Sequence, residues 1–173
     1  MDFEFFESLS PEEAWEFLQG FLETERNALK VMEAAAEQSG IRMDYSVESL
    51  PEVLKWILKD VRFMRVPVPA SEPEWIRQAH KDGLVEFDEE SKYLILRAAF
   101  YLGESFVQTY PSLWWTIGDQ KYIEQNMPVV AGFRLDLEMA PIMIVENMVR
   151  GVFGRGGPWT DVDRAITHWA GDV

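Results

Sequence analysis

The most apolar helical segment of the chain spans residues 91–110 and reads SKYLILRAAFYLGESFVQTY. Apolar residues recur at helical spacing in two overlapping rows, one beginning at Leu94 and the other at Ile95. Long polar side chains interrupt the segment at only four positions, Lys92, Arg97, Glu104 and Gln108. A helix that is apolar nearly all round belongs in the interior of a protein. We therefore expect this segment to be the central helix of the fold.

The pattern changes to short strands after Pro111, which ends the central helix. Residues 113–117 are aromatic and β-branched, Gly118 and Asp119 suggest a turn, and residues 121–123 are then expected to pair back. Residues 128–133 predict a further strand that residues 135–137 extend. The sequence therefore predicts an α+β fold, with long helices packed on a small antiparallel sheet of three or four short strands.

Four more helices are expected, two before the central helix in the sequence and two after it. Ser10, Pro11 and Glu13 form a capping box with proline at the first helical position, so a long helix should span residues 11–38. Helical periodicity also covers residues 50–62, with Ser49 as the cap, and residues 141–153. A last helix should begin at Thr160. A shorter helix is possible over residues 74–81.

A proline-rich stretch at about residues 64–74 separates the second helix from the rest of the chain. Three prolines within seven residues exclude a regular helix there. Neither flank is large enough to be a domain of its own, so the stretch is interpreted as an internal loop. Residues 1–173 are expected to form a single compact domain.

Charge and composition exclude several classes of function. The chain has 16 basic and 30 acidic side chains, a formal charge of −14, and no cysteine. Disulfides and thiolate sites are therefore absent, and a field of this sign repels nucleic acids. The N-terminus is acidic where a secretory signal would be basic, and no apolar run is long enough for a membrane span. The sequence predicts a cytoplasmic protein that binds neither nucleic acid nor membrane.

The negative charge is concentrated near the N-terminus, where eight acidic side chains and no basic one precede Arg26. Such a surface speeds encounter with a basic protein. We expect the partner-binding residues to be Glu12, Glu13, Glu16 and Glu23. The alternative interpretation is that the charge serves solubility alone.

A second candidate site is centred on a carboxylate within the central helix. An aromatic pocket of a small-molecule-binding module or enzyme would be lined by Tyr101, Trp114, Trp115 and Phe133, with Glu104 as its polar anchor. The structural alternative is an anchor, in which Glu104 accepts a hydrogen bond from an indole N–H or a backbone amide. Gly103 would then allow the backbones to approach closely.

Two short motifs resemble a group of small bacterial proteins of unassigned function. They are residues 44–50, DYSVESL, and residues 98–104, AAFYLGE, followed by an aromatic strand with Trp115. Some members of this group look like immunity proteins of polymorphic toxin systems. Over residues 40–135 the resemblance implies a helix-and-sheet domain without a cofactor, acting by binding a cognate toxin.

The remaining motifs are interpreted structurally. His80 and His168 lack metal-ligand spacing, so no metal or other cofactor is expected. The glycine-rich residues 151–158 lack the Lys-Ser/Thr of a phosphate loop and are expected to end a helix. No constellation is typical of nucleophilic or acid–base catalysis, so no catalytic residue is assigned. Trp159 and Trp169 could support a homodimer through the last helix.

Overall fold

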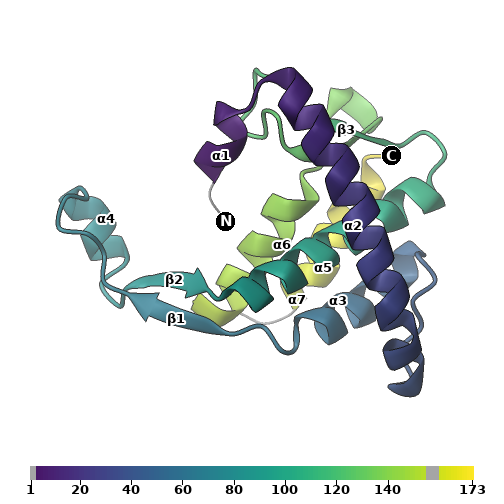
Figure 1. Ribbon diagram of the computed structural model, residues 1–173, viewed down its shortest axis with the longest axis horizontal. Helices are drawn as coiled ribbons and strands as arrows, with labels where there is room; N and C mark the ends of the chain where they lie inside the picture. The colour runs from purple at the N-terminus through teal and green to yellow at the C-terminus, as the bar shows by residue number, and fades with distance from the viewer. Residues whose placement is uncertain (1–2, 155–159) are drawn as a thin grey trace.

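Helix α5 (Glu89–Thr109) occupies the middle of the computed structural model, which describes residues 3–154 and 160–173 (Figure 1). The side chain of Asp88 caps it by accepting a hydrogen bond from the amide of Ser91. Every residue from Ala98 to Phe106 is buried, because α2, α3 and α6 surround this part of the helix. The prediction of a central helix is therefore confirmed.

Helix α2 (Pro11–Gln38) is the longest element and crosses α5 on one side of the molecule. The capping box at its start is formed as predicted, with reciprocal bonds between Ser10 and Glu13. Gly40 follows its end in a left-handed conformation, with φ 75°, which favours glycine. A short helix that the sequence did not predict, α1 (Phe3–Ser8), precedes it.

Helix α3 (Leu50–Leu58) is shorter than the predicted 50–62 and follows a 3₁₀ turn, η1 (Val47–Ser49). The predicted cap is wrong in detail, because the Ser49 side chain makes no cap bond. Ser46 instead caps the turn by accepting from the amide of Ser49 at 3.2 Å. Near the C-terminus lie α6 (Pro141–Val149), a π-helical turn η3 (Arg150–Gly154) and α7 (Thr160–Gly171). Of the predicted glycine-rich residues 151–158, residues 151–154 lie in η3 and residues 155–158 lie outside the described residues.

The strands form two separate two-stranded antiparallel sheets. The α+β class is confirmed, but one sheet of three or four strands is wrong. Strand β3 (Trp114–Ile117) pairs with β4 (Pro128–Ala131) alone. Residues 121–123 lie in the turns between them, where Gly118 approaches the Glu124 carbonyl too closely for a Cβ. Residues 135–137 do not extend β4, because a 3₁₀ turn, η2 (Arg134–Asp136), begins before them.

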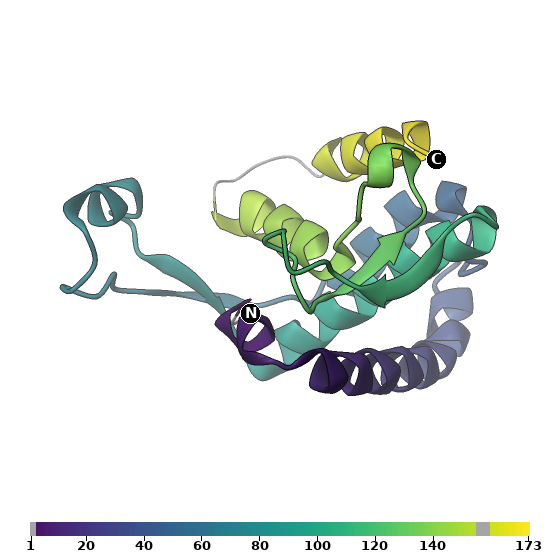
Figure 2. The same cartoon turned by 90° about the horizontal axis from the view of Figure 1, so that it is seen from above.

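The second sheet lies in the stretch interpreted as an internal loop. Strand β1 (Phe63–Val66) pairs with β2 (Leu84–Phe87), and helix α4 (Glu74–Ala79) lies between them. Together these elements form a projection, residues 63–87, that leaves the body of the molecule in both views (Figures 1 and 2). We call this projection the arm.

The buried apolar side chains form one cluster around α5. It takes side chains from α2, α3 and α6 and from the β3–β4 ribbon, and α7 adds Ile166. From the arm it receives Phe87, and the half-buried Val85 packs against it, both at the base. The body of the fold is therefore complete without the rest of the arm.

Candidate functional site

The four predicted partner-binding residues all lie exposed in the first half of α2. Glu12, Glu16 and Glu23 are separated by four and seven residues, so their side chains share one face of the helix. The buried residues of this half, Ala14, Leu18 and Phe21, lie on the opposite face. We call Glu12, Glu16 and Glu23 the acidic stripe.

Glu13 has a different role from the acidic stripe. Its carboxylate accepts a hydrogen bond from the amide of Ser10 at 2.8 Å, and the Ser10 hydroxyl accepts one from the amide of Glu13. These bonds hold the pKa of the Glu13 carboxyl below its ordinary value. Within the part of the chain that the structure describes, the three residues of the stripe form no hydrogen bond or ion pair through their side chains. Their charges are available to a partner.

Two exposed indoles lie close to this charged surface. Trp15 follows Glu12 by three residues and is 44% exposed, and Trp114 is 55% exposed on β3. Trp114 borders a shallow hollow of about 540 Å³ at the start of α2, together with Pro11, Asp119 and Glu138. Exposed tryptophans are enriched in protein interfaces, because they offer a large apolar area and a hydrogen-bond donor.

The second predicted site contains a filled contact between α5 and β3. The indole Nε1 of Trp115 donates a hydrogen bond to Glu104 Oε2 at 3.1 Å. Gln108 donates to the other oxygen at 3.1 Å, and the guanidinium of Arg26 lies 3.7 Å from it. The carboxylate is therefore held by an indole, an amide and a cation, and its side chain is 12% exposed.

The indole of Trp115 occupies the volume next to this carboxylate. A Cβ at Gly103 would lie 2.3 Å from the indole ring and 3.1 Å from Pro141. The ring of Phe100 stacks on the indole with an interplanar angle of 4°, and Phe21 meets it edge-on. This packing leaves no room for a ligand between Gly103 and Trp115, which favours the anchor over the pocket.

The other residues assigned to the pocket lie elsewhere. Trp114 points away from Trp115, as neighbouring residues of a strand do. Phe133 packs between Phe106 and Trp169. Tyr101 is fully buried on another side of α5. The structure thus brings together only Glu104 and Trp115 of the four residues predicted for this site.

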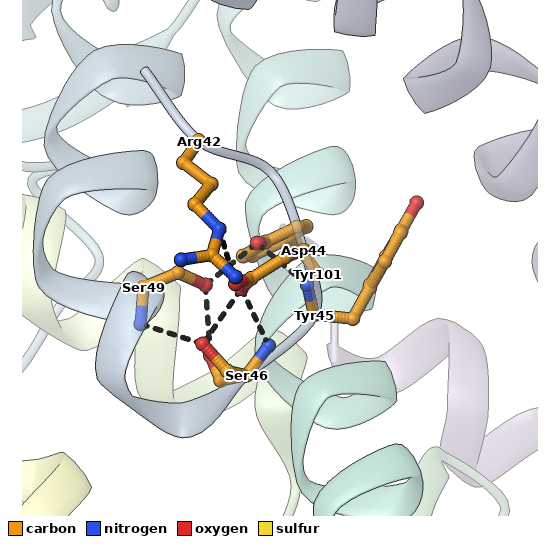
Figure 3. Close-up of polar contacts among 6 residues, drawn as sticks. All are labelled: Arg42, Asp44, Tyr45, Ser46, Ser49 and Tyr101. Atoms are coloured by element: carbon orange, nitrogen blue, oxygen red, sulfur yellow. Dashed lines mark hydrogen bonds and ion pairs between the residues drawn. The ribbon is translucent and has the colours of Figure 1, made fainter.

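Tyr101 instead joins the two motifs on which the resemblance rests (Figure 3). Its hydroxyl lies 2.8 Å from the hydroxyl of Ser49 and accepts a hydrogen bond from the amide of Tyr45 at 3.1 Å. The ring of Tyr45 packs on that of Tyr101 with centroids 4.9 Å apart. Residues 44–50 are thereby fixed to residues 98–104, a contact that the sequence reasoning did not predict.

The chain around Tyr45 is held in an unusual conformation by local hydrogen bonds. Tyr45 has φ 56°, in the left-handed region. Asp44 Oδ1 accepts from both the amide and the hydroxyl of Ser46, at 3.0 and 2.6 Å, and Arg42 pairs with Oδ2 at 2.7 Å. These bonds lower the pKa of Asp44, while burial raises the pKa of Tyr45 to about 12. The cluster fixes the start of α3.

A buried carboxylate in α2 was missed by the sequence reasoning. Glu25 is 4% exposed, and its Oε2 lies 3.8 Å from Arg97 Nε without a hydrogen-bond partner. Burial raises the pKa of this carboxyl, and the charge of Arg97 partly opposes the shift. The signal was present in the sequence, because Glu25 stands four residues from both Phe21 and Leu29 on the apolar face.

Comparisons with protein-family models, with curated proteins and with solved structures find no match to this chain. Within residues 3–154 and 160–173, no group of three His, Asp or Glu side chains could hold a metal ion. No helix in these same two ranges is both long and apolar enough to cross a membrane.

Proposed function

We propose that this chain is a protein-binding module without catalytic activity, and that the acidic stripe on α2 binds a basic protein. The observation that carries the proposal is a set of three exposed carboxylates, Glu12, Glu16 and Glu23, which lie on one face of a long helix and have no partner among the residues that the structure describes. The cognate toxin of an immunity pair is the partner that the resemblance of residues 44–50 and 98–104 suggests.

The geometry of the stripe supports this proposal in two ways. Glu12 and Glu23 are separated by eleven residues, which at about 1.5 Å per residue places their backbones roughly 16 Å apart on a helix. Three separated charges on one rigid element suit a row of basic side chains rather than a single small cation. The nearby indole of Trp15 adds apolar contact area beside the charges.

The experiment neutralises the stripe with the triple variant Glu12→Gln, Glu16→Gln, Glu23→Gln. Binding is titrated by calorimetry against the purified products of the genes that flank the gene of this chain. The matched control is Glu48→Gln, Glu52→Gln, Glu90→Gln, which changes the net charge equally at exposed positions outside α2. We expect the stripe variant to weaken binding about tenfold or more, and the control by less than about threefold.

Salt provides a second readout of the same complex. Because exposed charges are screened, the affinity should fall steadily as sodium chloride is raised from low to high concentration. The stripe variant should show a shallower dependence on salt than the control. Equal weakening by the two triple variants, or an affinity that salt does not change, would overturn the proposal.

A further inference from the structure

The arm exposes large apolar side chains at a distance from the body (Figures 1 and 2). Trp75 of α4 is 71% exposed, and Met64 of β1 is 57% exposed. Phe63 is also exposed, and among residues 63–87 only Phe87 is fully buried. A two-stranded ribbon is marginally stable in water unless its face packs on something. The core of this chain covers only the base of the arm.

The base of the arm is fixed firmly to the body. Arg150 donates a hydrogen bond to the carbonyl of Val85 at 2.6 Å, and its guanidinium lies over the ring of Phe87. The same guanidinium pairs with the buried carboxylate of Glu146 at 2.7 Å. These contacts direct the ribbon outward, so that α4 is presented to other molecules.

An apolar groove lies at the same end of the molecule. Its apolar lining comes from α1, α2 and the start of α5, namely Phe5, Phe6, Phe17, Tyr93 and Leu96, and encloses about 390 Å³. Strand β2 ends at Phe87 and α5 begins at Glu89, so the groove adjoins the base of the arm. Figures 1 and 2 agree that α1 and this base lie at one end of the body.

Charge indicates what can occupy this groove. The arm has three basic and four acidic side chains, a net charge of −1, whereas the remaining 148 residues carry −13. Residues 74–81 at its tip, which include Trp75, Arg77 and Lys81, have a net charge of +1. The groove lining contains the ion pair of Glu89 with Lys92, whereas α1 and the first half of α2, which form the rest of the wall, carry acidic side chains and no basic one. The tip and the groove are therefore complementary in charge as well as in apolar character.

We infer that the chain forms a symmetric homodimer in which the arm of each copy places Trp75 in the groove of the other. A two-fold interface requires that both complementary surfaces lie on the same chain and on the same side. The arm and the groove meet this requirement, because they adjoin at one end of the molecule. Two copies, each with a formal charge of −14, repel each other. The arm has a net charge close to zero, so this repulsion is weakest when the arm forms the contact.

The first test measures the oligomeric state by sedimentation over a wide range of protein concentration. Trp75→Ala should weaken dimerisation at least tenfold, as expected for a central aromatic anchor. Ile123→Ala is the matched control, because Ile123 is also 71% exposed but lies in the turn between β3 and β4. A chain that stays monomeric at every concentration, or equal effects of the two variants, would overturn the inference.

The second test uses the absence of cysteine to map the contact. Two single-cysteine variants are mixed, Gln78→Cys beside Trp75 in the arm and Lys92→Cys in the groove, and treated with a short bismaleimide. We expect several-fold more covalent heterodimer than in a mixture of Gln78→Cys with Lys30→Cys on the exposed side of α2. Equal yields in the two mixtures would contradict the proposed contact. Neither test changes a residue of the acidic stripe. A failure of the proposed dimer can therefore be told apart from a failure of the proposed binding to a basic protein.

Discussion

The two ribbons of this protein have the same length and pairing but opposite environments. Strands β3 and β4 pair over four residues each, and every residue of β4 is buried. Strands β1 and β2 also pair over four residues, yet three of the four residues of β1 are exposed. The comparison shows that strand pairing alone does not decide where a ribbon lies. One ribbon is held by the core around α5, and the other is left for another molecule to cover.

The contact between α5 and β3 gives the strongest way to test this comparison. Gly103→Ala should lower the free energy of unfolding by about 3 kcal/mol, because the added Cβ would meet the indole of Trp115 at 2.3 Å. Urea denaturation measures the change. Gly20→Ala in α2 is the control, since nothing lies within 4 Å of its added Cβ, and it should stabilise the helix by up to about 1 kcal/mol. Similar effects at the two glycines would show that the contact between Gly103 and Trp115 is not tightly packed.

Matched truncations in the two ribbons sharpen the comparison directly. Val129→Ala in β4 removes methyl groups from a fully buried site and should cost about 2 kcal/mol of unfolding free energy. Met64→Ala in β1 should change it by less than about 0.5 kcal/mol at protein concentrations too low for association. A comparable loss at Met64 would mean that the arm belongs to the core of its own chain.

The stability that the polar cluster at the start of α3 contributes should depend on one hydroxyl group, that of Tyr101. Tyr101→Phe removes the partner of Ser49 and of the Tyr45 amide, and we expect a loss of about 1.5 kcal/mol in urea denaturation. Tyr122→Phe, at an exposed position outside this cluster, should leave the stability within about 0.5 kcal/mol of the original. If Tyr101→Phe leaves the stability unchanged, residues 44–50 are held in place by the packing of the aromatic rings alone, and the account of the hydrogen bonds is wrong.

Substitution of the buried Glu25 should change the free energy of unfolding least of the four, and the change should depend on pH. Burial raises its folded-state pKa above the ordinary 4.5, so the folded chain binds the proton more tightly than the unfolded chain. The contribution of Glu25 to stability therefore falls as the pH rises from about that value through the raised pKa.

Glu25→Gln removes this titration and should stabilise the chain by about 1 kcal/mol at pH 7. At pH 4 the two proteins should differ less, as measured by thermal or urea unfolding at both values. A destabilised Glu25→Gln at pH 7 would show instead that the ion pair with Arg97 is favourable overall.

The sequence predicted those elements whose signals are local. The Ser10–Glu13 capping box gave the start of α2, and the apolar rows from Leu94 and Ile95 gave the buried α5. The β1–β2 ribbon was not predicted, because the prolines at 67, 69 and 73 exclude a helix but say nothing of a strand on either side. The pairing of Phe63 with Phe87 closes a long connection, which no short-range pattern encodes.

The candidate sites were predictable to different extents. Exposure of Glu12, Glu16 and Glu23 follows from helical periodicity once α2 is assigned. The sequence placed Tyr101 and Glu104 in one aromatic pocket, although they stand three residues apart in residues 98–106, the part of α5 that is buried on every side. Tyr101 therefore faces Ser49 while Glu104 faces Trp115, a division that depends on which neighbour packs on each face.

Hydrogen exchange of the backbone amides tests most directly whether this chain keeps one ribbon in its own core and offers the other to a second copy. In dilute protein we expect the amides of β3 and β4 to exchange slowly, near the limit set by global unfolding, and those of β1 and β2 to exchange much faster. Raising the protein concentration should slow exchange in β1, β2 and α4 while leaving β3 and β4 unchanged. Equal protection of the two ribbons in dilute protein, or exchange in the arm that does not respond to concentration, would contradict the account.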